Sequence, residues 1–250
     1  MLNVDFHSHT HFSRCGLHSI IEMLTEARNR GLVALAITDH GSALKSSVPS
    51  TFFDRLAPNV VEGITLLKGM ECNVTDGDGT IDFRHKFLPY MDIVLLGLHP
   101  NLEAEQPQDY YTSVLLKAIE KNPVIDIITH PEDIHYPVDF DALAHYAQQH
   151  NIVLELNNSK ILYNRVTPGV TLEFLKACKR NNCRIAINSD AHARQEIGLD
   201  SSVRPLVKQA DFPEELIVNS TAETAFAFLA ECRAKRKKLA AVAAAAEVGA

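Results

Sequence analysis

The stretch VDFHSHT, residues 4–10, decides how the fold of this chain is predicted, because a short apolar run ends there in two histidines one residue apart. In a β-strand, residues i and i+2 point to the same side. His7 and His9 can therefore both reach one metal ion from the end of a strand, with imidazole nitrogens at about 2.0–2.1 Å from zinc. The chain has 12 histidines, so one such pair arises easily by chance and counts only together with the rest of the sequence.

Apolar runs of strand length recur along the chain, and most of them stop at a histidine or a carboxylate. Continuous apolar runs are typical of parallel strands that are covered on both faces. The predicted strands are the run that ends at His7 and residues 32–37, 64–70, 92–98, 124–129, 152–157 and 184–189. The predicted helices between and after them cover about residues 19–30, 109–120, 139–150, 171–181, 203–210 and 222–232.

Two α/β folds accommodate such an order of elements: a closed β/α barrel and an open, doubly wound sheet. In an open sheet, functional groups gather at one switch point, whereas in a barrel all strand ends converge on one mouth. At least six strand ends carry side chains that bind metals, namely His7 and His9, His40, Glu71, His99, His130, and Asp190 with His192. This distribution favours the barrel, with a metal site at the C-terminal ends of its strands.

The number of these side chains exceeds the needs of a single ion. Zinc usually takes four ligands, whereas six histidines and two carboxylates would surround this mouth, so two or three metals are predicted. Glu71 and Asp190 are the natural bridging groups. Paired metal ions about 3.5–4 Å apart are used to hydrolyse phosphate esters and some amides.

Seven motifs, taken together, resemble the polymerase and histidinol phosphatase (PHP) family, and most closely its small bacterial trinuclear-zinc phosphatase branch. The motifs are HSHT (7–10), ITDHG (37–41), GME (69–71), GLH (97–99), THP (129–131), ELNNS (155–159) and SDAH (189–192), and the likeness covers roughly residues 2–232. The resemblance implies a distorted (β/α)7, TIM-like barrel and phosphoesterase activity. It also implies up to three zinc ions per chain, with manganese or iron as the other candidate metals.

The resemblance further implies how the ligands are divided among three metals. The first metal would be held by His7, His9, Glu71 and Asp190. The second would be held by Glu71, His99 and His130, and the third by His40 and His192.

One position departs from the family pattern. Where the branch has a further ligand histidine, six residues after the second histidine of the HSHT motif, this chain has Cys15. A thiolate binds zinc at about 2.3 Å, so we expect Cys15 to complete the third site. His11 and His18 lie in the same loop and are the rival donors.

The predicted function is hydrolysis of a small phosphomonoester, with hydroxide activated by the multinuclear site as the nucleophile. Arg165 matches a basic position of the same branch, and a guanidinium suits bidentate phosphate binding, so it is the candidate substrate-binding residue. The first alternative is a metal-dependent amidohydrolase, which also uses an HxH pair and a late aspartate. The second is a non-catalytic metal-binding accessory module, which would have lost ligands.

Composition sets the remaining expectations. Hydrophobic residues make up 46% of the 250 residues and charged residues 22%, as in an ordinary globular protein, and one domain over 1–235 is predicted. Residues 236–250 form an alanine-rich tail, expected to be disordered or a frayed helix. The net charge of −7 argues against a nucleic-acid partner. Five cysteines without a CxxC pair, no apolar run long enough for a membrane span and no signal-like start predict a cytoplasmic location, and the oligomeric state is left open.

Overall fold

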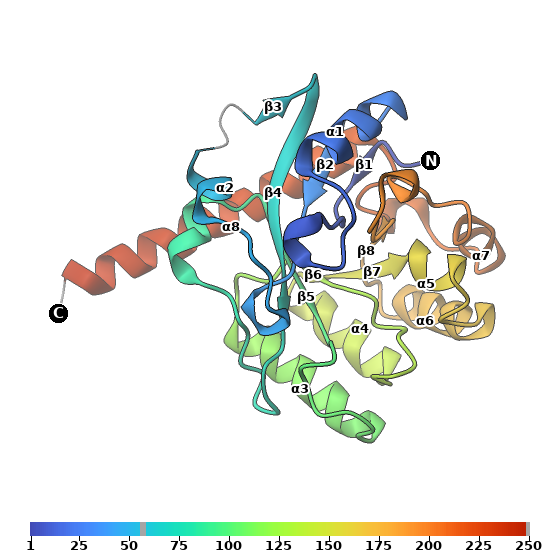
Figure 1. Ribbon diagram of the computed structural model, residues 1–250. Coiled ribbons are helices and arrows are strands. Elements are labelled where there is room, and N and C mark those ends of the chain that lie inside the picture. Colours follow the sequence, from blue (N-terminus) through green and yellow to red (C-terminus); the bar gives the residue numbers. More distant parts are fainter. Residues whose placement is uncertain (56–58, 249–250) are drawn as a thin grey trace.

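Seven parallel strands form the centre of the molecule in the computed structural model, which describes residues 1–55 and 59–248 (Figure 1). Each strand pairs with the next in the order β1-β2-β4-β5-β6-β7-β8. Their bounds are β1 (Val4–Asp5), β2 (Ala34–Ile37), β4 (Ile64–Asn73), β5 (Ile93–Gly97), β6 (Ile127–Ile128), β7 (Val153–Asn157) and β8 (Ile185–Asn188). All seven predicted strands are confirmed. The two-residue β3 (Val60–Val61), antiparallel to β4, was not predicted.

The first and last strands meet just beyond their C-terminal ends. Ser8 and Ala191 form a parallel bridge, and the backbone N–H of His9 donates to the carbonyl of Ala191 at 2.8 Å. Closer to the strands, the backbone N–H of Phe6 donates to the side-chain oxygen of Asn188 at 3.1 Å. The sheet therefore nearly closes into the predicted TIM-like barrel.

The helices that were predicted between strands are present, and their starts follow ordinary capping chemistry. Ser19 and Glu22 form a capping box at α1, the Asp139 side chain accepts from the N–H of Ala142 at α4, and Thr167 caps α6. The helices are α1 (Ile20–Asn29), α2 (Ser50–Asp54), α3 (Gln108–Lys121), α4 (Phe140–Gln149), α5 (Asn158–Leu162), α6 (Pro168–Arg180), α7 (Arg204–Gln209) and α8 (Ala222–Val248).

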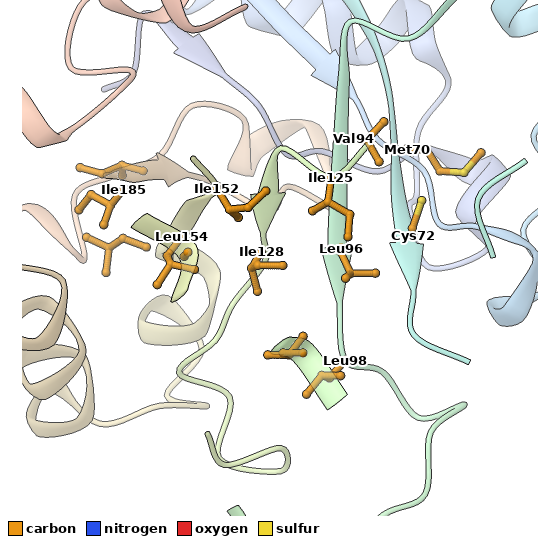
Figure 2. Close-up of a cluster of buried hydrophobic side chains, with 14 of the residues drawn as sticks. Met70, Cys72, Val94, Leu96, Leu98, Ile125, Ile128, Ile152, Leu154 and Ile185 are labelled. Carbon is orange, nitrogen blue, oxygen red and sulfur yellow. The ribbon is translucent and has the colours of Figure 1, made fainter. Parts of the chain in front are cut away.

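Side chains of the strands alternate between two separate cores. In β5, Val94 and Leu96 belong to the larger core between the sheet and its covering helices, and Ile93 and Leu95 belong to the smaller core inside the barrel. Figure 2 shows part of the larger core, where aliphatic side chains of neighbouring strands form a continuous layer. Burial on both faces explains why the strands read as uninterrupted apolar runs.

Helix α8 closes the barrel at the end opposite the histidines. Phe228 packs against Phe6 inside the barrel, with ring centroids 5.7 Å apart. Further along the helix, Arg233 donates to Asp92 at 2.7 Å, and the buried Arg236 pairs with the buried Asp126. Because Asp92 and Asp126 directly precede β5 and β6, α8 covers the N-terminal ends of the strands.

Helix α8 is longer than the helix predicted over 222–232. It continues to Val248 and extends beyond the body of the molecule (Figure 1). The expected boundary at residue 235 therefore falls inside a continuous helix, next to the buried Arg236. The division of the chain into a domain and a tail stays a prediction, and residues 249–250 lie outside the described part. No helix in the described ranges is both long and apolar enough to cross a bilayer.

Candidate metal centre

The C-terminal ends of the strands bring the predicted ligand residues together. His7 and His9 follow β1, His40 follows β2, and Glu71 lies near the end of β4. The remaining candidates are His99 after β5, His130 after β6, and Asp190 and His192 after β8. All of these side chains are buried except that of His192, which is partly exposed.

Glu71 lies at the centre of the group. Its Oε2 is 2.9 Å from His40 Nδ1 and 3.3 Å from His7 Nε2. Its Oε1 is 3.1 Å from His130 Nε2 and 3.3 Å from His99 Nε2. One carboxylate thus faces imidazoles from several strands with both of its oxygens, and this geometry is compatible with the predicted bridging of two metal ions.

Asp190 joins the two histidines of the HSHT motif. Its Oδ1 is 3.4 Å from His7 Nε2 and 3.3 Å from His9 Nε2, and the same two nitrogens lie 3.3 and 3.4 Å from Glu71 Oε2. The other oxygen of Asp190 accepts a hydrogen bond from Asn157 Nδ2 at 3.1 Å. These four side chains are the set expected to hold a first metal, and the structure places them around one point.

Cys15 lies with His9, His40 and His192, and one ligand atom from each of these residues lies within 4.8 Å of the others. His9 was not assigned to this group from the sequence. Hydrogen bonds with His192 and His40 outweigh the effect of burial and lower the pKa of Cys15 to about 6. The low pKa favours the thiolate, which is the form that binds zinc.

The two rival histidines of the same loop lie elsewhere. His11 is exposed and packs against Phe12, with ring centroids 4.3 Å apart. The Nδ1 of His18 accepts a hydrogen bond from the backbone N–H of Arg194 at 3.3 Å. Neither histidine belongs to a metal-ligating cluster among the described residues, so Cys15 is the donor that the structure offers at this position.

A layer of polar side chains orients the candidate ligands, and most of it was missed from the sequence. Glu155 accepts from His7 Nδ1 at 2.7 Å, Ser13 Oγ lies 3.1 Å from His9 Nδ1, and Thr129 Oγ1 donates to Glu71 Oε1 at 2.7 Å. Ser13 in turn donates to Asp39. Thr129 and Asp39 directly precede the candidate ligands His130 and His40 in the THP and ITDHG motifs. This neighbouring position was the sequence feature from which their supporting role could have been predicted.

Several buried polar atoms of the centre lie close to one another but form no hydrogen bond of regular geometry within the described residues. They are His40 Nδ1, Glu71 Oε2 and both ring nitrogens of His99. Buried polar atoms are normally satisfied, so this concentration indicates a missing ligand. Nitrogen, carboxylate oxygen and thiolate together are the donor set of zinc, and the residues therefore fit that metal.

Carboxylates and histidines of the centre stabilise one another's charge. Burial lowers the pKa of His40, but Glu71 and Cys15 outweigh it and raise the pKa to about 10, so His40 must release a proton to bind a metal. Burial opposes ionisation of Glu71, but His7, His99 and His40 outweigh it and hold the pKa of this carboxyl well below its usual range. Burial also disfavours the charged form of His99, and it lowers the pKa of this imidazole to about 4. An ionised Glu71 and a neutral His99 both present lone pairs to a cation.

A cavity of about 750 Å³ opens above the centre. His99, His130 and His192 form part of its floor. Its walls include Lys160, whose ammonium pairs with Asp133, and the exposed Arg165. The volume is within the range of about 300–1,000 Å³ that small-molecule sites occupy.

Comparison with known proteins identifies the family of the chain. The family model described as the PHP domain matches residues 5–163. A protein of Caldicellulosiruptor saccharolyticus named "Probable phosphatase" is 35% identical over 230 residues, which covers 91% of this chain and 96% of the relative. Another "Probable phosphatase", from Tolumonas auensis, is 33% identical over 235 residues, with 93% and 95% covered.

A solved structure with the same fold is histidinol phosphate phosphatase of Lactococcus lactis subsp. lactis, in complex with zinc, L-histidinol and phosphate. Its TM-score is 0.64 and its sequence is 17% identical, and the match covers 84% of this chain and 94% of that one. A hisK structure from Listeria monocytogenes, described as a putative histidinol phosphatase, matches with a TM-score of 0.55 and 15% identity, covering 80% and 99%. The extent of the PHP domain match, together with relatives above 30% identity over nearly their whole length, shows that this chain belongs to the PHP domain family.

Proposed function

We propose that this chain is a metal-dependent phosphomonoesterase. Relatives that match it over nearly their full length are named as phosphatases, and a structural neighbour holds zinc and phosphate. The observation that carries the proposal is the position of Glu71, whose two oxygens face four imidazoles from four strands at 2.9–3.3 Å. A single buried carboxylate among so many imidazoles is suited to bridging metal ions.

The division of ligands implied by the family resemblance gives three metal positions. His7, His9, Glu71 and Asp190 would hold one ion. Glu71, His99 and His130 would hold a second, and Cys15, His40 and His192 a third. Bound zinc would supply Lewis acidity, which lowers the pKa of a coordinated water and withdraws charge from phosphoryl oxygens.

The protein side chains contribute orientation and charge. Glu155 fixes the tautomer of His7 by accepting from Nδ1, so that Nε2 presents its lone pair. Thr129 donates a hydrogen bond to one oxygen of Glu71, and Asn157 donates one to an oxygen of Asp190. At the cavity wall, Arg165 offers a planar guanidinium that suits the paired oxygens of a phosphate group.

The substrate is proposed to be a small phosphomonoester, because the cavity admits a phosphate and a modest organic group. The two alternatives are less well supported. Membership of the PHP family and the names of the relatives favour phosphate esters over amides. A non-catalytic module would have lost ligands, whereas the nine candidates converge here. The cytoplasmic location stays a prediction, and all five cysteines are free.

The test is hydrolysis of 4-nitrophenyl phosphate by protein that has been purified without chelator. We expect activity at neutral to alkaline pH, its loss on metal removal and its return with zinc. Asp190→Asn is expected to lower turnover by at least about 10²-fold, since it removes a charge from the metal site. Asp211→Asn, at a carboxylate whose side chain is 98% exposed, serves as the control. Activity that survives chelation, or an Asp190→Asn variant at the wild-type rate, would contradict the proposal.

A further inference from the structure

The loop after β6 forms a fixed wall of the cavity. The N–H of Asp133 donates to the carbonyl of His130 at 3.0 Å, and the N–H of Tyr136 donates to the carbonyl of Asp133 at 3.1 Å. Beyond the loop, Gln108 Nε2 donates to the carbonyl of Val138 at 2.9 Å. Pro137 also restricts the backbone of Tyr136 to extended conformations. The loop is therefore tied at both ends, and Tyr136 lies on its inner turn.

The ring of Tyr136 is held by packing. Only 9% of this residue is exposed, and its ring meets that of Tyr111 edge-on, with centroids 5.3 Å apart and planes at 85°. Tyr111 is fully buried, and its hydroxyl donates to the carbonyl of Glu103 at 2.8 Å. Because Tyr111 is fixed in this way, Tyr136 has little freedom to rotate out of the wall.

Tyr136 lies next to the metal centre. It encloses a void of only about 10 Å³ together with His130, Thr129 and Leu98. A void of that size holds at most about one water, so the tyrosine is close to His130. Tyr136 also lines the large cavity whose floor holds His99 and Asp190.

The hydroxyl of Tyr136 is a polar group of this wall that forms no hydrogen bond within the described residues. The Tyr111 hydroxyl donates to one backbone group and accepts from another, the N–H of Gln106 at 3.1 Å. The Tyr136 hydroxyl makes no hydrogen bond with any residue in the described ranges, and it is not among their fully buried unpaired atoms. Because Tyr136 lines the cavity, a molecule bound there is the candidate partner for this hydroxyl.

We propose that Tyr136 contacts the substrate, and that its hydroxyl donates a hydrogen bond to the oxygen that leaves phosphorus. This inference rests on the proposed phosphomonoesterase function. The phosphoryl group would lie over the floor, and the ester oxygen would point along the wall of the β6 loop. The oxygen of a water molecule bonds to phosphorus as the bond to the ester oxygen breaks, and a proton of that water ends on the departing alcohol. Negative charge grows on the ester oxygen before the proton arrives, and a fixed donor stabilises it more in the transition state than in the bound substrate.

The proposal makes the effect of the hydroxyl depend on the leaving group. Nitrophenolate delocalises its charge and needs little help, whereas an alkoxide concentrates its charge on the single oxygen that Tyr136 would contact. Tyr136→Phe removes only the hydroxyl and keeps the ring that packs on Tyr111. Tyr146→Phe is the matched control, because Tyr146 stacks on His150 beside α3 and does not line the cavity above the metal centre.

The experiment compares kcat/KM of the wild type and both variants for 4-nitrophenyl phosphate and for glycerol 2-phosphate, with metal content measured on each preparation. We expect Tyr136→Phe to keep its metals and its activity on the aryl ester within about twofold, and to lose roughly 10²-fold on the alkyl ester, as when one donor to a growing oxyanion is removed. Equal losses on both esters, or no loss on either, would overturn the proposal. A wild type that is inactive on every phosphomonoester would instead contradict the proposed function.

Discussion

Glu155 accepts a hydrogen bond from Nδ1 of His7 at 2.7 Å, and this contact points the other ring nitrogen of the histidine at Glu71 and Asp190. The carboxylate is fully buried and also accepts from the N–H of His130 at 2.9 Å. It therefore couples two candidate ligand histidines that follow different strands. Carboxylates that orient ligand histidines in this way tune the affinity of a metal site.

Glu155→Gln tests this role. We expect metal affinity to fall by about 10- to 100-fold, the range typical of lost orienting partners. The loss is measured by competition with a chelator of known affinity. Glu132→Gln is the control, because Glu132 is equally buried but contacts the N–H of Asn157 instead of a histidine. Unchanged affinity in Glu155→Gln would show that the contact does not orient a metal ligand.

Cys15 is predicted to ligate a metal together with His40 and His192. A thiolate bound to metal is shielded from alkylation, so labelling with iodoacetamide should be slow in the metal-loaded protein and fast after chelation. Mass spectrometry locates the label, and the other four cysteines, which are buried, provide the internal reference. Equal labelling of Cys15 in both states, with unchanged metal content in Cys15→Ala, would contradict ligation by the thiol.

Asp126 and Arg236 are predicted to contribute strongly to stability, because both are buried where α8 meets the barrel. Asp126→Asn leaves the guanidinium without its carboxylate and should cost about 3–5 kcal/mol in the free energy of unfolding, measured with urea at pH 7. The control Asp141→Asn breaks an exposed pair with Arg180 and should cost no more than about 1 kcal/mol.

The same pair predicts a pH dependence. Burial acts to raise the pKa of Asp126, but Arg236 and Lys235 outweigh it and lower the pKa below the ordinary value of 3.8. The unfolded chain therefore takes up a proton first, and the contribution of Asp126 is full above about pH 4 and declines as the pH falls further. The difference between wild type and Asp126→Asn should shrink in that range. A constant difference down to pH 2 would contradict this account.

The positions of the strands along the chain were predictable because parallel strands bury both faces. The two cores take alternate residues of β5, so its apolar run has no polar interruption up to His99. Helix α5 was not predicted, although the sequence offered a local signal for it. Asn157 is an ordinary N-cap residue, and its side chain accepts a hydrogen bond from the N–H of Lys160. The shortness of β6 was not predictable, because the apolar run over 124–129 says nothing about which residues pair.

The candidate ligands could be predicted because they lie at the ends of apolar runs. The side chains that form hydrogen bonds with them could not be predicted in this way. Glu155 lay alone inside an apolar run and was compatible both with metal binding and with a supporting role, and only its distance from His7 separates the two. The part of α8 around Arg233 and Arg236 is held by ion pairs with Asp92 and Asp126, more than 100 residues away in sequence. Periodicity within one segment carries no information about such contacts.

The central claim is that the strand ends hold a multinuclear metal site. The most direct test is elemental analysis of protein purified without chelator, expressed as metal equivalents per chain. The account predicts between two and three equivalents, with zinc as the principal metal, because the candidate ligands divide among three proposed positions, two of which share Glu71. One equivalent or fewer in undepleted protein would contradict it.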